Sequence, residues 1–148
     1  MEELYKEGKV RAIGVSNFNM NQISDLVKQH NVVPAVNQVE THPFSQKTDM
    51  QNALKSQGIQ LESWAPFAQG KNNLFNHELL VALSSKYHKN IVQVVLRWLI
   101  QRKVVVIPKL TNMERTNENF NVFDFGLSGD DLTAIKSLDE VSGLIYSV

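Results

Sequence analysis

The sequence predicts an α/β fold built from parallel βαβ units. Short β-type runs alternate with segments of helical periodicity along the chain, and the connections between them are short. Polar residues gather where the β-type runs end. Parallel α/β folds bind their ligands at the carboxyl ends of the strands, so this placement is the first indication of function.

Composition limits the class of protein before any motif is considered. The chain has 148 residues, which suits a single domain over residues 1–148, and 43% hydrophobic content is typical of a folded globular chain. Fifteen basic and fifteen acidic side chains balance, so we expect neither a nucleic-acid nor a membrane partner. No apolar run approaches the ~20 residues of a membrane span. The absence of cysteine excludes disulfides and thiolate chemistry and agrees with a cytoplasmic location.

The first predicted element is a helix at residues 1–7, which Gly8 ends. No capping residue precedes it, so we interpret it as the tail of a longer helix. A strand at residues 10–15 follows. A second helix begins at Asn19, where Gln22 completes a capping box.

The middle of the chain continues the alternation of strand and helix. Residues 35–40 are predicted to form a strand with polar residues toward its carboxyl end. Thr48 is expected to cap a helix, with Gln51 in the box position and Gly58 as the terminator. Residues 59–64 form the next predicted strand.

The second half contains more helix than strand. Its apolar run at residues 104–107 is typical of a buried parallel strand. The other predicted elements are a polar loop at 67–75, a helix capped by Asn76 and running toward Tyr87, an apolar helix starting at Asn90, a helix after Thr111 or Asn112, and a last helix capped by Ser128.

Two basic residues near one predicted helix N-terminus indicate a phosphate site. Lys109 follows the strand at 104–107, and Arg115 lies in the first turns of the next helix, whose free N–H groups favour an anion. Arg115, Glu118 and Asn119 are spaced i, i+3, i+4 and so share one helix face. Spacing alone is equally consistent with a solvated polar helix and an ordinary surface lysine.

Amide and hydroxyl groups cluster at two other strand ends. Ser16, Asn17, Asn37 and Gln38 could hold a carboxamide, because each amide offers both a donor and an acceptor. Helix capping and turn formation are the local alternative for all four. Trp64 could stack on a planar cofactor, or it could simply be half-buried core.

No metal site is expected. The four histidines show no ligand spacing, and glycine-rich phosphate loops of the G-x-G-x-x-G or G-x-x-x-x-G-K type are missing. The histidines are His30, His42, His77 and His88.

Taken together, the motifs resemble the aldo-keto reductases. The matching stretches are residues 8–18 (GKVRAIGVSNF), Asn37-Gln38 with His42-Pro43, residues 64–70 (WAPFAQG), and residues 106–109 (VIPK) with Glu114-Arg115 and Glu118-Asn119-Phe120. The stretch at Trp64 is similar to that of bacterial 2,5-diketo-gluconate reductases. The resemblance covers nearly the whole chain.

This resemblance implies a TIM barrel that binds NADPH without a Rossmann domain and reduces aldehydes and ketones by hydride transfer. A complete barrel takes ~250 residues. The chain would therefore be its C-terminal half, an α/β unit of about four parallel strands with flanking helices.

The resemblance also assigns roles to residues. Leu110 stands where the family commonly has Ser or Thr, which implies loss of a hydroxyl contact to the 2′-phosphate. On the nicotinamide side, the resemblance implies that Ser16, Asn17 and Gln38 contact the carboxamide and that Trp64 stacks on the ring. Ala65, Phe67 and Gln69 would contact the pyrophosphate. Lys109 and Arg115 would contact the 2′-phosphate and Glu118 and Asn119 the adenine, and Leu110 and Thr111, which follow Lys109, are counted with the cofactor-binding residues.

The family's catalytic Asp, Tyr, Lys and His come from the first half of the barrel, so we assign no catalytic residue here. Tyr5, Tyr87 and Tyr146 lie in helical or tail contexts. We expect the chain alone to be inactive and to meet a carbonyl substrate only when the missing half completes it. The alternatives are a non-catalytic nucleotide-binding scaffold and a half barrel that forms a homodimer through its open edges.

Overall fold

The computed structural model describes residues 1–109 and 113–140. Within the chain two compact units are distinguished, and each is described by itself. Unit 1 comprises Met1–Val39 and Lys47–Glu62, and unit 2 comprises Glu40–Gln46 and Ser63–Val148.

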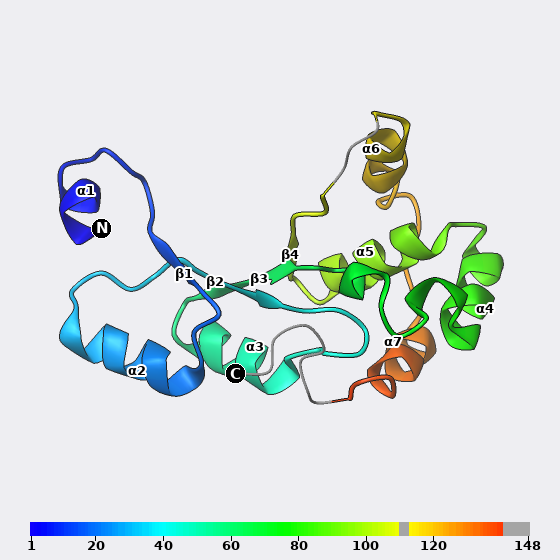
Figure 1. The fold of residues 1–148 in the computed structure, drawn as a ribbon, viewed down its shortest axis with the longest axis horizontal. Coiled ribbons are helices and arrows are strands. Elements are labelled where there is room, and N and C mark those ends of the chain that lie inside the picture. The colour runs from blue at the N-terminus through cyan, green and yellow to red at the C-terminus, as the bar shows by residue number, and fades with distance from the viewer. Residues whose placement is uncertain (110–112, 141–148) are drawn as a thin grey trace. The chain divides into compact units, whose positions relative to one another are not determined.

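Four strands form one sheet in which they are hydrogen-bonded in chain order. β1 and β2 are parallel, with Gly14 opposite Val36 and Ser16 opposite Gln38. The predicted α/β class with parallel strands and flanking helices is confirmed. The strands are β1 (Gly14–Ser16), β2 (Val36–Glu40), β3 (Gln60–Trp64) and β4 (Val105–Val106), and Figure 1 labels them.

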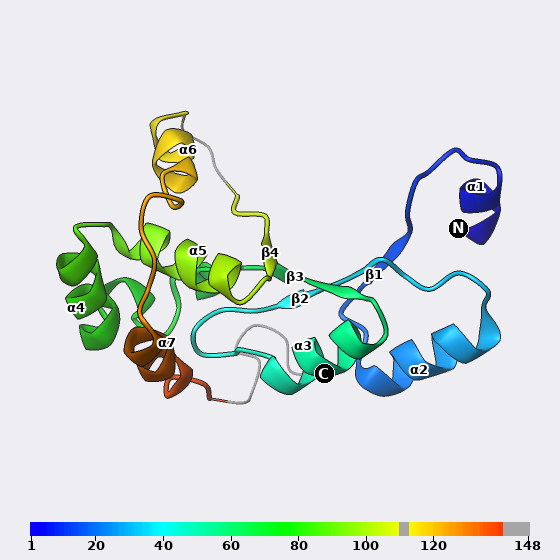
Figure 2. The ribbon, with the colours of Figure 1, turned by 180° about the vertical axis from the view of Figure 1, so that it is seen from behind.

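Unit 1 contains α1 (Glu2–Lys6), α2 (Met20–Gln29) and α3 (Thr48–Ser56). The predicted capping box of α2 is present: Asn19 Oδ1 accepts from the Gln22 backbone N–H, and Gln22 Oε1 accepts from the Asn19 N–H at 2.8 Å. The apolar faces of α2 and α3 bury Ile23 and Leu54 completely. Both views place these two helices side by side (Figures 1 and 2).

Unit 2 contains α5 (Ile91–Gln101), which at 11 residues is the longest helix in the described part of the chain. α5, predicted to be apolar, buries Val94, Trp98 and Leu99 against α4, whose Leu80 and Leu83 are also buried. α4 also packs on α7 in both views (Figures 1 and 2). The elements are the 3-10 turns η1 (Ala68–Gly70) and η2 (Leu74–Asn76), and the helices α4 (Glu78–Tyr87), α5 (Ile91–Gln101), α6 (Met113–Phe120) and α7 (Gly129–Lys136).

Two predicted helix caps are wrong. Lys47, not Thr48, is the N-cap of α3, and its left-handed backbone (φ 52°) starts the helix one residue earlier, so Thr48 is already helical. Asn76 closes η2, and its side chain donates to Asn73 Oδ1 at 3.1 Å. α4 therefore has His77 as its N-cap, without a side-chain capping bond.

In the described part of the chain, no helix combines the length and the apolar character that a membrane crossing requires.

Candidate functional site

Three of the predicted polar residues meet where β1 and β2 lie side by side in unit 1. Ser16 Oγ donates to the Gln38 carbonyl at 3.1 Å, and the Asn17 backbone N–H donates to the same oxygen at 2.9 Å. Asn17 has a left-handed backbone (φ 58°), which turns the chain as the strand ends. Ser16 and Asn17 are exposed, so their side chains are accessible to a ligand.

The Gln38 side chain is oriented by a residue that the sequence analysis missed. Its Nε2 donates to Glu62 Oε1 at 2.6 Å, a hydrogen bond strengthened by the carboxylate charge. This bond uses one amide hydrogen and fixes which end of the amide is the donor. The signal for Glu62 was its charge in the middle of β3, a strand whose neighbouring positions Leu61 and Ser63 are buried.

Asn37 has a structural role. Its side chain is fully buried, its Nδ2 donates to the Phe18 carbonyl at 2.8 Å, and its Oδ1 accepts from the Phe18 N–H at 3.4 Å. The Asn37 side chain therefore holds the Phe18 backbone, 19 residues away in the chain, and forms no local turn of its own.

The segment after β3, in unit 2, has an unusual backbone. Ala65, Ala68 and Gln69 all have φ near 50°, in the left-handed region where a residue with a Cβ costs about 1 kcal/mol or more. Two short turns hold the segment, with Ala68 N donating to the Ala65 carbonyl and Gly70 N to the Phe67 carbonyl, both at 2.9 Å. Such strain is typical of segments that are shaped in advance for a ligand.

A cavity of about 640 Å³ in unit 2 brings the second group of predicted residues together. Phe67 comes from the strained segment, Lys109 follows β4, and Glu118 and Asn119 come from α6. The cavity is within the usual range for a small-molecule site. Its other lining residues, which the sequence analysis did not identify as ligand contacts, are Phe75, Ser84, Asn90, Ile91 and Val92.

The chemistry of this cavity suits a ligand that carries both an anionic group, for Lys109, and hydrogen-bond donors, for the Glu118 carboxylate. Lys109 supplies an exposed cation, and Phe67 and Phe75 supply aromatic surface. Asn119 Nδ2 is buried, and among the described residues it has no hydrogen-bond partner. A buried amide donor without a partner is costly, so a ligand acceptor placed there would satisfy it.

The other predicted residues lie outside this cavity. Half-buried Trp64, which ends β3, and Ala65 and Gln69 beyond it are not among its lining residues in the described part of the chain. Leu110 and Thr111 lie outside the described residues. Arg115 is in α6, but its side chain also lies outside them.

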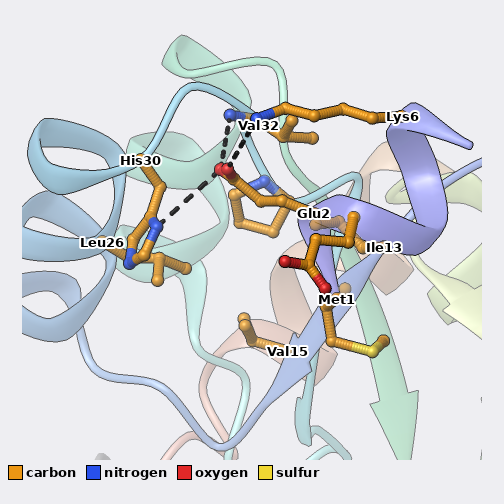
Figure 3. Close-up of a pocket in the computed structure, with 11 residues that line it drawn as sticks. Met1, Glu2, Lys6, Ile13, Val15, Leu26, His30 and Val32 are labelled. Carbon is orange, nitrogen blue, oxygen red and sulfur yellow. Dashed lines mark hydrogen bonds and ion pairs between the residues drawn. The ribbon is translucent and has the colours of Figure 1, made fainter.

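A separate cavity of about 500 Å³ in unit 1 is lined by α1, β1 and the end of α2. Figure 3 shows Glu2 pointing toward its three partners there. Glu2 accepts from the Val32 N–H at 3.1 Å and pairs with Lys6 and His30. The Val32 N–H bond lowers the pKa of Glu2 below its ordinary value. Because Glu2 adds a negative charge beside Lys6, this cavity suits a phosphate poorly.

The two tyrosines among the described residues lie on helices. Tyr5 is on α1. Tyr87 is the last residue of α4, and its hydroxyl donates a hydrogen bond to Asp131 Oδ2 in α7. Tyr146 lies outside the described residues. In the described ranges, no group of His, Cys, Asp and Glu could hold a metal ion.

Comparison with known proteins identifies close relatives. The model of the aldo/keto reductase family matches residues 1–140. The glyoxal reductase of Bacillus subtilis (strain 168) is 44% identical over 140 residues, which are 95% of this chain and 50% of that protein.

Solved structures agree with this match. A putative 2,5-diketo-D-gluconic acid reductase B is 35% identical with a TM-score of 0.91, over 99% of this chain and 52% of the other. An aldo-keto reductase of Bombyx mori in complex with NADP is 33% identical with a TM-score of 0.90, over 99% of this chain and 50% of the other. The chain thus spans about half the length of these relatives. The expected likeness and the half-barrel fold are confirmed.

Proposed function

Because this chain belongs to the aldo/keto reductase family, we propose that it supplies the cofactor-binding half of an NADPH-dependent reductase of aldehydes and ketones. A cytoplasmic location, expected from the absence of cysteine, is part of this proposal.

The cavity of unit 2 carries the proposal. Its residues fit the adenosine 2′-phosphate end of NADPH: Lys109 offers a cation to the phosphate, and Asn119 Nδ2 offers a donor to the adenine. Arg115 is the proposed second cation for the phosphate. Two cations on one phosphate would favour NADPH over NADH, which lacks that group.

The polar cluster of unit 1 fits a carboxamide such as that of nicotinamide. Ser16, Asn17 and Gln38 offer hydroxyl and amide groups to it. Trp64 is the proposed stacking partner for a nicotinamide ring. When bound, NADPH would supply the hydride for carbonyl reduction.

We assign no proton donor to this chain. Tyr87, which is bonded to Asp131, is committed to the packing of α4 on α7. We therefore expect no NADPH oxidation with glyceraldehyde above background by the chain alone. Clear turnover would contradict this assignment, whereas nucleotide binding without turnover agrees equally with the non-catalytic binding alternative.

Calorimetric titration tests the cavity directly, because the nucleotide fragment adenosine 2′,5′-bisphosphate needs only unit 2. We expect this fragment to bind at least about tenfold more tightly than 5′-AMP. Lys109→Met should remove most of that difference and leave 5′-AMP binding unchanged. Lys136→Met, at another exposed lysine of unit 2, is the matched control. Equal affinity for both nucleotides in the wild-type chain would contradict the assigned phosphate site.

A further inference from the structure

Helix α5 carries a polar stripe on an otherwise apolar surface. Gln93, Arg97 and Gln101 are spaced i, i+4, i+8, so they lie along one face. Each donates to a backbone carbonyl of the chain beyond the middle of α6. Arg97 Nη1 donates to the Val122 carbonyl at 3.2 Å, and Gln101 Nε2 to the Leu127 carbonyl at 3.0 Å.

Gln93, at the N-terminal end of this stripe, makes hydrogen bonds in two directions. Its Oε1 accepts from the Asn90 N–H at 3.0 Å, which completes the capping box of α5. Its Nε2 donates to the carbonyls of Glu118 and Asn121, at 2.9 and 3.1 Å. Asn90 Nδ2 adds a longer bond of 3.4 Å to Glu118 Oε2. Gln93 itself is only 6% exposed, so its bonds are shielded from water.

We propose that Gln93 is a positioning residue for the nucleotide cavity, an inference that rests on the proposed function. By holding the carbonyls of Glu118 and Asn121, its amide fixes the last turn of α6, on which Asn119 lies. Asn119 Nδ2 is the buried donor that has no hydrogen-bond partner among the described residues. The hydrogen bonds of Gln93 thus hold this donor in place before the nucleotide binds. The free energy of binding is then not reduced by the cost of ordering the last turn of α6.

The two functions of Gln93 depend on different atoms, the cap of α5 on its Oε1 and the tether to α6 on its Nε2. A substitution can therefore remove one function and keep the other. A capping box needs only a side-chain acceptor at this position, and glutamate serves as well as glutamine. Glutamate lacks the amide hydrogens and would place a carboxylate against two carbonyl oxygens. Gln93→Glu therefore keeps the cap of α5 and removes the tether to α6.

Gln101 provides a matched control on the same helix face. Its Oε1 accepts from the Leu127 N–H at 2.7 Å, and its Nε2 donates to the Leu127 carbonyl. Gln101→Glu removes the same kind of donor, but the partner is in the chain before α7 and does not line the cavity. Any general cost of placing a carboxylate beside a carbonyl appears in both variants.

The test combines calorimetry with hydrogen exchange in the full chain. Relative to wild type, Gln93→Glu should weaken adenosine 2′,5′-bisphosphate by about tenfold, and Gln101→Glu by less than about twofold. Gln93→Met removes the same donors without adding charge, and it also removes the cap acceptor. It should weaken the nucleotide as much as Gln93→Glu does, and it covers the case in which the charged variant does not fold. The amides of the last turn of α6 should exchange faster in free Gln93→Glu and recover at saturating nucleotide, while those of α5 stay protected.

The outcomes separate the two proposals. If the wild-type chain binds and the Gln93 variants bind equally well, the positioning role is wrong and the proposed function stands. If α5 and α6 lose protection together, Gln93 acts only on stability, and the inference fails in that case too. A wild-type chain that does not bind the fragment overturns both.

Discussion

Asp131 is a buried carboxyl group whose pKa lies far from its ordinary value. Burial by itself raises its pKa, but hydrogen bonds from Lys86, Tyr87 and Ser128 outweigh that effect and hold the pKa well below the ordinary 3.8. Lys86 Nζ lies 2.8 Å from the carboxylate, and Ser128 Oγ donates to it at 2.7 Å. The ionised group therefore joins α4 to the start of α7 in unit 2.

The pH dependence of stability follows from the direction of this shift. Because the folded-state pKa is lowered, the contribution of Asp131 is complete at neutral pH and declines as pH falls below 3.8, where the unfolded chain takes up the proton first. Asp131→Asn should lower Tm at pH 7 and flatten the fall in Tm between about pH 5 and pH 3. Thermal melts of both proteins across this range check it. Parallel profiles would show that the carboxylate contributes nothing to acid sensitivity.

Substitution of Asn119 should raise the free energy of unfolding and weaken nucleotide binding. Asn119→Leu replaces a buried donor that has no partner among the described residues with an apolar group of similar size, so it should raise the free energy of unfolding by about 1 kcal/mol. The same change removes the proposed adenine contact and should weaken adenosine 2′,5′-bisphosphate by about tenfold. Urea denaturation and calorimetry measure the two effects. Lower stability with unchanged affinity would contradict the assignment.

At the scale of elements, helix starts could be predicted where the capping side chain and the backbone N–H that it bonds are within four residues of each other in the sequence. The box of Asn19 with Gln22 and the cap at Ser128 formed as expected, and Asn90 starts α5. The predicted cap at Thr48 is wrong because the N-cap is one residue earlier, at Lys47, whose backbone is left-handed. The pattern of Thr48 with Gln51 three residues later does not reveal a left-handed residue before the helix.

The close approach of β1 and β2 gives an element-scale prediction. A Cβ at Gly14 would lie 2.5 Å from Val36 Cγ2 and 3.1 Å from the Val36 carbonyl oxygen. Gly14→Ala should therefore destabilise the chain by about 1–3 kcal/mol in urea denaturation. Val36→Ala should recover part of this loss in the double variant.

Gly129 at the start of α7 is the control for that prediction, since a Cβ there meets nothing within 4 Å. Gly129→Ala should change stability by less than about 0.5 kcal/mol. Equal effects at the two glycines would show that the contact with Val36 is not the cause.

At the scale of the whole molecule, the chain matches about half of its relatives' length, and its sheet order leaves β1 and β4 at the ends. Strand edges offer backbone groups for pairing with another chain. We therefore propose self-association, with a light-scattering mass near twice 16.8 kDa. Val105→Lys, at a β4 side chain that is 42% exposed, should shift the chain toward monomer. A stable wild-type monomer at micromolar concentration would contradict the proposal.

The sequence by itself determined the order of elements, most helix starts and the family likeness. These depend on periodicity, on capping groups a few residues apart and on motifs that stand in the chain as written. Only the tertiary structure decided that Glu62 holds Gln38 and that Gln93 tethers Glu118. It also decided that the buried Asn119 Nδ2 has no hydrogen-bond partner among the described residues. The physical reason is that each of these features depends on groups brought together from distant segments. Packing sets which polar atoms meet, and neither spacing nor composition encodes that directly.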